Sequence, residues 1–367
     1  MKIIISGGGT GGHVFPAIAI ADALKQLDPA TEILFVGAQG KLEMEKVPKA
    51  GYPIKGLKIS GFQRKLTVKN FINLFHLVGS LWKARKIVRN FQPDVVVGVG
   101  GYASGPTLEM AHRQGIPILV QEQNSYAGVT NKLLAKKAAK VCVAYPKMER
   151  FFPKEVIQLT GNPVRKDLQS LDHLRMDGIK HFGLDPTKKT ILIVGGSLGA
   201  KTLNIAMRFN TESIEKLKSI QILWQAGKLY IEAYKKCETA QLPNVKIRAF
   251  LDRMDLAYAA ADVVIARAGA GTISELCLVG KPTVLIPSPN VAEDHQTENA
   301  KALVEAQAAI MVKDSDATLE MLPKAIHILR NDTKRRQLSQ QIKTLARPDA
   351  ARDIAQAVRE LASKGSY

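Results

Sequence analysis

Glycine-rich turns are the residues of this sequence most suited to chemistry. Four of them stand where a short apolar run gives way to an amphipathic stretch, at residues 6–13, 98–106, 195–200 and 266–272. Glycine lets the backbone approach a ligand closely, and the N–H groups at a helix N-terminus attract phosphate. One such loop is weak evidence, because a tight turn needs glycine for steric reasons alone. Four loops spread over both halves of the chain favour an anionic, phosphate-bearing ligand.

Three ionisable side chains beside these loops could act on such a ligand. His13 ends the first loop, and an imidazole with an ordinary pKa of about 6.5 can remove a proton near neutrality. A histidine that caps the helix or orients a phosphate is the alternative, and Glu122 competes for the role of base. Glu275 follows the fourth loop by one helical turn, where a carboxylate can accept both hydroxyls of a ribose. A glutamate that only favours the helix dipole is equally compatible with that spacing.

Two further patterns have the form of known ligand sites but lack their surroundings. Gly7, Gly9 and Gly12 satisfy the GxGxxG spacing of dinucleotide-binding folds, which also need an acidic residue at the end of the second strand. The sequence there is Phe35-Val36-Gly37-Ala38, so a nicotinamide site is disfavoured. Asp314-Ser315-Asp316 has the form of a DxD metal motif, but a solvated loop that caps a helix explains it better. We therefore expect no catalytic metal and no cofactor.

The elements that must position these loops alternate along the whole chain. Short apolar runs bounded by glycine alternate with amphipathic stretches, as in βα units around a parallel sheet. We expect two doubly wound α/β domains, residues 1–164 and 165–348, with ligands at the carboxyl ends of the strands. The stretch 349–363 is expected to fold back as a helix over the first domain. The expected strands are 2–6, 32–36, 95–99, 118–121, 141–144, 156–159, 190–194, 220–224, 245–249, 263–266, 283–286 and 309–312, and the helical patterns include 16–27, 203–217 and 272–279.

Composition restricts the partners that the chain can have. Its 367 residues are 46% hydrophobic and 23% charged, which is typical of a globular protein. Lysine and arginine number 52 against 33 acidic residues, a net charge of +19 that implies an anionic partner. Three widely spaced cysteines suggest neither a disulfide framework nor a zinc site and fit a reducing compartment. We expect no signal peptide and no membrane-spanning helix, which would need about 20 apolar residues.

Basic charge is concentrated in the first half, where residues 1–164 carry 22 basic and 10 acidic side chains. No acidic residue lies between Glu45 and Asp94, and apolar residues are interleaved with the cations there. Such a surface suits an anionic membrane leaflet, although a buried helix face is the alternative. The expected membrane residues are Phe71, Phe75, Leu81, Trp82, Lys69, Lys83, Arg85, Lys136 and Lys140. Nucleic acid is not expected, because aromatic residues are only 6% and no reading motif is present; a basic α/β binding module remains the non-enzymatic alternative.

Several motifs in order along the chain together resemble the MurG family of peptidoglycan glycosyltransferases. They are the first glycine loop with His13-Val14-Phe15-Pro16, Gly100-Gly101-Tyr102, Glu122-Gln123-Asn124, Gly161-Asn162-Pro163-Val164-Arg165, Gly195-Gly196-Ser197, residues 269–275 and Asp294-His295-Gln296-Thr297. The resemblance implies a GT-B fold, with two Rossmann-like domains facing each other across a deep cleft. It implies an inverting, metal-independent transfer of N-acetylglucosamine from UDP-N-acetylglucosamine to the C4 hydroxyl of undecaprenyl-diphosphate N-acetylmuramoyl-pentapeptide. The enzyme would act peripherally at the cytoplasmic face of the bacterial inner membrane.

The same resemblance implies the residues that contact each substrate. The nucleotide sugar is expected to contact Arg165, Ser197, Leu251, Ala270, Gly271, Thr272, Glu275 and Gln296 of the second domain. From the first domain, the donor sugar and reaction region are expected to be lined by Thr10, Gly11, Gly12 and Asn124, and the acceptor by Gly100, Gly101 and Tyr102. Ala268 and His295 stand where some relatives have serine and glutamine. A UDP-N-acetylglucosamine 2-epimerase, which shares the two-domain architecture, remains the enzymatic alternative.

Overall fold

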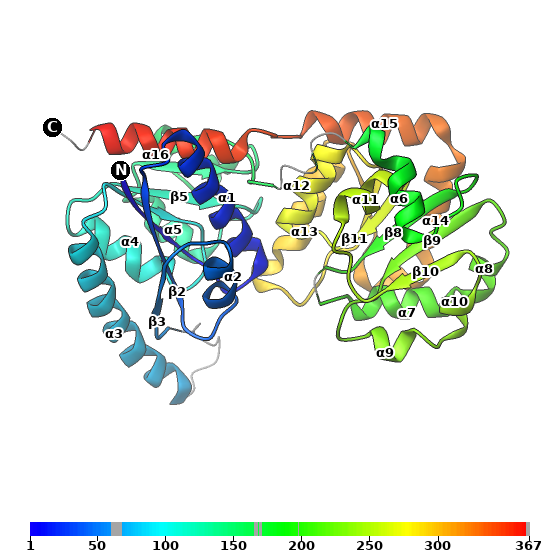
Figure 1. The fold of residues 1–367 in the computed structure, drawn as a ribbon, viewed down its shortest axis with the longest axis horizontal. Helices are drawn as coiled ribbons and strands as arrows, with labels where there is room; N and C mark the ends of the chain where they lie inside the picture. The colour runs from blue at the N-terminus through cyan, green and yellow to red at the C-terminus, as the bar shows by residue number, and fades with distance from the viewer. Residues whose placement is uncertain (60–67, 165–167, 169–170, 197, 365–367) are drawn as a thin grey trace. The chain divides into compact units, whose positions relative to one another are not determined.

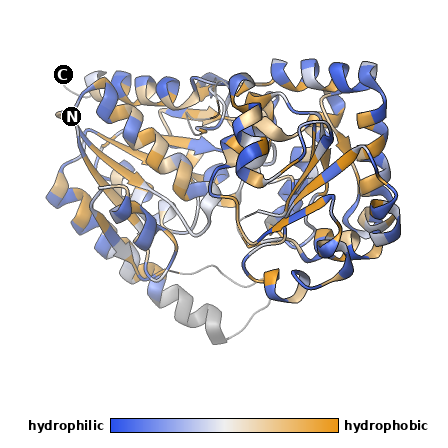
Figure 2. Cartoon of the chain, turned by 45° about the vertical axis from the view of Figure 1, so that its right-hand side comes forward, coloured by the Kyte–Doolittle hydropathy of each residue, from blue (hydrophilic) through white to orange (hydrophobic). Residues whose placement is uncertain are grey.

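The computed structural model describes residues 1–59, 68–164, 168, 171–196 and 198–364, without the side chains of residues 68–75, 172, 292 and 364. The chain divides into two compact units (Figure 1). The first comprises Met1–Val164 together with Arg347–Tyr367, and the second comprises Arg165–Ala346. Figure 2 shows the strands of each unit largely hydrophobic, with hydrophilic residues on the helices around them.

The first unit is built on a parallel sheet in the order β3-β2-β1-β4-β5-β6-β7. Its strands read as continuous apolar runs, such as Ile3–Ile5, because helices cover both faces of the sheet. The strand order reverses between β1 and β4, and ligands of such folds bind outside the carboxyl ends of the strands at that point. The strands are β1 (Lys2–Ser6), β2 (Glu32–Ala38), β3 (Ile54–Leu57), β4 (Val95–Gly98), β5 (Ile118–Glu122), β6 (Lys140–Val143) and β7 (Ile157–Leu159).

Two groups of helices cover this first sheet. One group, α1, α2 and α16, shares a buried cluster with alternate residues of the strands, including Ile3 and Ile5. The last helix of the chain packs along α1 and buries Ile354 and Val358 there. In the other group α4 packs on β4 and lies between α3 and α5. The bounds are α1 (Gly11–Leu27), α2 (Glu43–Lys49), α3 (Val68–Phe91), α4 (Ser104–His112), α5 (Val129–Ala135) and α16 (Ala350–Lys364), with 3-10 turns η1 (Met148–Arg150) and η2 (Lys154–Val156).

The second unit repeats the architecture with a parallel sheet in the order β10-β9-β8-β11-β12-β13. Its strand order reverses between β8 and β11, which again marks the expected ligand position. The strands are β8 (Lys189–Val194), β9 (Ile220–Gln225), β10 (Val245–Arg248), β11 (Val263–Ala266), β12 (Thr283–Leu285) and β13 (Ile310–Met311). The helices are α6 (Arg175–Phe182), α7 (Lys201–Phe209), α8 (Thr211–Glu215), α9 (Ile231–Tyr234), α10 (Glu238–Gln241), α11 (Met254–Ala260), α12 (Ala270–Val279), α13 (His295–Glu305), α14 (Ala317–Arg330) and α15 (Asp332–Thr344), with 3-10 turns η4 (Asp172–Leu174), η5 (Ala292–Asp294) and η6 (Asp314–Asp316).

The expected fold class, two doubly wound α/β domains, is confirmed. Three details differ from the expectation. The helix expected over 16–27 begins at Gly11, so the last residues of the first glycine loop form its first turn. The edge strand β3 was not predicted, because its four residues include Lys55 and Gly56 and lack a continuous apolar run. The helical pattern 203–217 forms two helices, α7 and α8, which meet at Asn210. The Asn210 side chain donates to the Ala206 and Thr318 carbonyl oxygens, each at 2.8 Å, and so competes with helix continuation.

Candidate active site

The loops that follow β1, β4 and β5 meet at the carboxyl edge of the first sheet. The Gly8 N–H donates to the Gly100 carbonyl at 3.2 Å, and Gln123 Nε2 donates to the Val99 carbonyl at 2.6 Å. A Cβ atom on Gly101, whose φ is +88°, would lie 2.3 Å from the Gly8 carbonyl oxygen. The residues expected at the acceptor, Gly100 and Gly101, therefore lie directly beside the first glycine loop.

His13 lies in the first turn of α1, at the border between these loops. Its Nδ1 is 3.2 Å from Thr10 Oγ1, and its ring lies 2.9 Å from the position that a Cβ atom on Gly100 would occupy. The imidazole is half-buried, whereas Tyr102, which follows Gly101 in the chain, is exposed. The structure thus brings together the expected base, the expected acceptor loop and Thr10.

Glu122 is buried and its carboxylate is surrounded by donors. Oε1 accepts from the backbone N–H of Asn124 at 3.0 Å and from its side chain at 3.3 Å. Oε2 accepts from the Gly128 N–H at 3.1 Å and from Asn131 Nδ2 at 2.8 Å. Burial raises the pKa of the Glu122 carboxyl, and these hydrogen bonds oppose that rise. The carboxylate therefore fixes the loop that positions Asn124.

Glu43 belongs to the same edge and was not expected there. Its side chain is buried; Oε2 accepts from the Gly9 N–H at 2.8 Å and Oε1 from the Ala38 N–H at 2.9 Å. A Cβ atom on Gly8 would lie 2.2 Å from this carboxyl group, so glycine is required for that packing. No sequence pattern identifies Glu43, because it reaches the first loop from the following βα unit.

These contacts limit which backbone N–H groups of the first glycine loop are available to bind a phosphate. The N–H groups of residues 7–9 donate to the Val36 carbonyl, the Gly100 carbonyl and Glu43, respectively, so the protein itself uses them. The first-turn N–H groups of α1 at residues 11–12 have no partner within the helix by geometry. A ligand at this loop would therefore meet residues 11–12 rather than residues 7–9.

In the second unit, the N-terminus of α12 is open to a ligand. Gly269 is its N-cap residue, with a φ of −68° that any residue can adopt. Among the described residues, a Cβ atom on Gly271 would meet no atom within 4 Å, and one on Gly269 would only meet Thr272 Oγ1 at 3.9 Å. Neither packing nor backbone conformation demands glycine at these positions. Their small size leaves the backbone accessible from outside, an arrangement that could accept a phosphate at this helix N-terminus.

Glu275 and Gln296 lie on the helices that border this opening. The buried Tyr258 hydroxyl donates to Glu275 Oε2 at 2.9 Å and so holds the carboxylate one turn along α12. Gln296 Oε1 accepts from the Ser288 N–H at 2.9 Å, which ties α13 to the loop after β12. Leu251 is buried in the loop after β10. Arg165 and Ser197, also expected at the donor, lie outside the described residues.

The expected membrane residues are only partly described. Trp82 is 71% exposed on α3, Leu81 is half-buried, and Lys83, Arg85 and Lys136 are exposed. Lys140 instead pairs with Glu360 of α16 at 2.9 Å. The side chains of Lys69, Phe71 and Phe75 are outside the description. None of the described helices combines the length and the apolar composition that a membrane-spanning segment requires.

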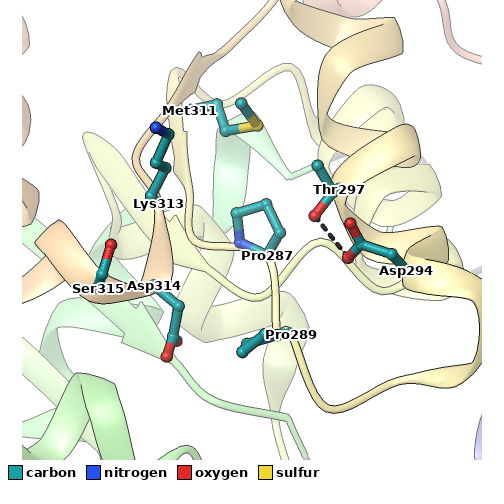
Figure 3. Close-up of a pocket in the computed structure, with 8 residues that line it drawn as sticks. All are labelled: Pro287, Pro289, Asp294, Thr297, Met311, Lys313, Asp314 and Ser315. Carbon is teal, nitrogen blue, oxygen red and sulfur yellow. Dashed lines mark hydrogen bonds between the residues drawn. The ribbon is translucent and has the colours of Figure 1, made fainter.

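A cavity of about 490 Å³ opens beside the ends of β12 and β13 (Figure 3). Its lining residues are Pro287, Pro289, Asp294, Thr297, Met311, Lys313, Asp314 and Ser315, and they include none of the expected donor contacts.

The described residues contain no group of three or more His, Cys, Asp and Glu side chains arranged to hold a metal ion. Asp316 occupies the N-cap position of α14, as expected of a helix cap, but within the described structure its side chain makes no capping hydrogen bond.

Comparison with known proteins covers both units. Residues 3–143 match the glycosyltransferase family 28 N-terminal domain, and residues 190–357 match the glycosyltransferase family 28 C-terminal domain. A curated Bacteroides fragilis protein is 55% identical over 99% of this chain and 96% of its own length. A Phocaeicola vulgatus protein is 55% identical over 99% of this chain and 97% of its own. Both are named UDP-N-acetylglucosamine--N-acetylmuramyl-(pentapeptide) pyrophosphoryl-undecaprenol N-acetylglucosamine transferase.

Solved structures show the same architecture. The crystal structure of Acinetobacter baumannii MurG matches with a TM-score of 0.78 and 31% identity, over 98% of this chain and 99% of that one. A UDP-N-acetylglucosamine 2-epimerase from Neisseria meningitidis matches with a TM-score of 0.68, over 98% of this chain and 100% of that one. At 14% identity, the epimerase shares the fold alone.

Proposed function

The chain belongs to glycosyltransferase family 28, and we propose from this membership that it transfers N-acetylglucosamine from UDP-N-acetylglucosamine to undecaprenyl-diphosphate N-acetylmuramoyl-pentapeptide. The observation that carries the proposal is the 55% identity over 99% of the chain to proteins named for this reaction. The product is the disaccharide lipid precursor of peptidoglycan. The attacking group is the C4 hydroxyl of the muramoyl sugar, and a single displacement inverts the anomeric configuration.

The second unit binds the donor. The diphosphate lies at the N-terminus of α12, where residues 270–272 present backbone N–H groups and the helix dipole favours negative charge. Glu275, held by the buried Tyr258 hydroxyl, accepts the ribose hydroxyls. Gln296 contacts the sugar, and Leu251 borders the nucleotide. Arg165 and Ser197 complete the donor contacts in this proposal.

Replacement of Glu275 by glutamine is expected to weaken UDP binding by about 1–3 kcal/mol, because a charged hydrogen bond to the ribose is lost. Glutamine keeps an acceptor for Tyr258 and nearly the same volume. Isothermal titration with UDP and with 2′-deoxy-UDP measures the effect, and the loss should be smaller for the deoxy nucleotide.

The matched control is Glu298→Gln on α13, which breaks only the ion pair with Lys301. It should leave both affinities unchanged. Equal UDP affinity in wild type and Glu275→Gln would remove Glu275 from the nucleotide site.

His13 is the general base in this proposal. The acceptor oxygen attacks the anomeric carbon, the bond from that carbon to the diphosphate oxygen breaks with its electron pair, and the hydroxyl proton passes to the imidazole. Glu122 is less suited to this role, because both its oxygens already accept hydrogen bonds, from its own loop and from Asn131 of α5. The departing diphosphate is stabilised by the α12 amides and Arg165, without a metal or cofactor.

We also propose that the first unit contacts an anionic membrane leaflet, where the lipid-borne acceptor resides. Helices α3 and α5 flank α4, and each exposes two apolar side chains one turn apart: Val78 and Trp82, and Val129 and Leu133. We call these four residues the apolar ridge. The exposed Lys83, Arg85 and Lys136 lie on or next to these helices, and each cation near such a surface contributes about 1 kcal/mol. Lys140 is left out of this surface because it pairs with Glu360.

Replacing Trp82 by serine is expected to lower binding to anionic vesicles about 10- to 150-fold, since burying an aromatic side chain contributes about 1.5–3 kcal/mol. The control is Phe209→Ser, which replaces a similarly exposed aromatic side chain of the second unit. This variant should bind vesicles like the wild type. Co-sedimentation with phosphatidylglycerol-containing vesicles measures both. Retention of Trp82→Ser equal to that of wild type would exclude the apolar ridge from the contact.

One incubation and one gel-retardation assay test the proposed reaction against its alternatives. The protein is mixed with radiolabelled UDP-N-acetylglucosamine, with and without a polyprenyl-diphosphate muramoyl-pentapeptide acceptor. Label in the lipid extract that depends on the acceptor supports the transferase. Conversion of the sugar nucleotide without acceptor would instead indicate an epimerase, and salt-sensitive retardation of oligonucleotides without turnover would indicate a nucleic-acid-binding module.

A further inference from the structure

An ion pair ties together the carboxyl edge of the second sheet. Arg267 follows β11 directly, and its Nη1 lies 2.5 Å from Asp314 Oδ1 in the turn after β13. The same Nη1 donates to the carbonyl oxygens of Ile286 and Pro287 after β12, at 3.0 and 3.3 Å. Thr202 Oγ1, in the first turn of α7, donates to Asp314 Oδ2 at 3.0 Å. These contacts join the connections that follow β8, β11, β12 and β13.

The pair is shielded from solvent. The side chain of Arg267 is 12% exposed and that of Asp314 is 24% exposed. Charges at this depth are screened less by salt than surface pairs, and removing one partner leaves the other charge poorly solvated. All three contacts are made by Nη1, so this one nitrogen joins the Asp314 carboxylate to the two carbonyl groups after β12.

Each element that the pair holds leads directly into the donor site of the proposed function. Arg267 stands two residues before Gly269, the N-cap of α12. The Pro287 carbonyl immediately precedes Ser288, whose N–H donates to Gln296 at 2.9 Å. Thr202 anchors the helix that follows the glycine loop after β8. The ion pair therefore holds in place both the segment that leads to the α12 backbone amides and the loop that is hydrogen-bonded to Gln296.

The DxD-like sequence has this structural role rather than that of a ligand site. Asp314 points in the opposite direction from the Lys313 amine (Figure 3), and both its oxygens are used by Arg267 and Thr202. The Ser315 hydroxyl donates to Asp316 at 2.8 Å. The two carboxylates thus serve different partners.

We propose that Arg267 and Asp314 are positioning residues for the donor. The inference rests on the proposed donor site at α12. The pair fixes the N-terminus of α12 and the loop that bears Gln296 in the spacing that the diphosphate sugar requires. Misplacing binding groups by about 1 Å is enough to change rates and affinities strongly.

Asp314→Asn in the full-length protein tests this inference. It retains the side-chain shape but removes the charge that holds Arg267. Titration calorimetry with UDP should show a dissociation constant raised about tenfold or more. In the radiolabel assay KM for UDP-N-acetylglucosamine should rise in parallel, with a much smaller change in kcat at saturating donor. Thr202→Val, which keeps the ion pair, should raise the dissociation constant by only about 2- to 10-fold and serves if Asp314→Asn does not fold.

The matched control is a similar pair at the opposite end of the same strands. Arg175 Nη2 lies 3.1 Å from Asp262 Oδ2, which also accepts from the Thr190 N–H at 2.8 Å. Asp262→Asn should lower Tm but leave UDP affinity and KM unchanged. If Asp314→Asn and Thr202→Val bound UDP as tightly as the wild type and Asp262→Asn do, the inference would be overturned. The proposed donor site would not be affected by that result. Failure of the wild-type protein to bind UDP would overturn the proposed donor site and this inference with it.

Discussion

Replacement of His13 by alanine is expected to lower kcat for transfer to the lipid acceptor by about 10²- to 10⁴-fold, the usual contribution of a positioned general base. The imidazole lies between Thr10 and the loop of Gly100, whereas the donor contacts that we propose are dominated by the second unit. Titration with UDP should therefore give a nearly unchanged dissociation constant. The acidic limb of the kcat/KM profile, which reports protonation of the base in the free enzyme, should disappear in the variant.

His112→Ala is the matched control, because this exposed histidine ends α4 away from the glycine loops. It should keep wild-type turnover and the same acidic limb. Turnover of His13→Ala within a few-fold of wild type would assign the proton transfer to another group. Parallel losses of turnover and UDP affinity would instead indicate a binding role for His13.

The second large effect is expected for Gly101→Ala. The new Cβ would lie 2.3 Å from the Gly8 carbonyl oxygen and 3.0 Å from its nitrogen, at a φ of +88° that alanine disfavours. Backbone strain and overpacking together should reduce the free energy of unfolding by about 3 kcal/mol or more. Transfer activity should fall with it, because the loops after β1 and β4 must separate to admit the methyl group.

Gly105→Ala provides the comparison for this prediction. Its Cβ, within α4, would lie 3.6 Å from Thr130 Cγ2, an ordinary van der Waals distance. That variant should be as stable as wild type or slightly more stable, because alanine favours helix more than glycine. Chemical denaturation of both variants measures the difference. A Gly101→Ala protein as stable as Gly105→Ala would mean that the two loops do not pack as described.

Much of the fold could be predicted because both sheets are parallel and covered on both faces. Strands such as Val95–Val97 are then continuous apolar runs, and the glycines after them mark where each strand ends. The prediction failed where burial was incomplete, as in the short edge strand Ile54–Leu57. It also failed where a side chain competes with the helix backbone, as Asn210 does between α7 and α8.

The candidate site could be predicted only where loops follow neighbouring strands. His13 and Gly100 lie together because β1 and β4 are adjacent and parallel, so their carboxyl ends meet. Glu43 and the pair of Arg267 with Asp314 could not be found in this way. Their partners are fixed by tertiary packing across 34 and 47 residues of chain, and a carboxylate or guanidinium alone does not reveal which distant amide it will meet.

The return of α16 to the first unit sets an order of assembly during synthesis. The ribosome completes residues 1–164 first, yet α1 keeps an uncovered apolar face until Ile354 and Val358 have emerged. Domains generally finish folding in the order in which they are made. Here the first unit is translated first but completed last, because the whole second unit is synthesised between its two chain segments.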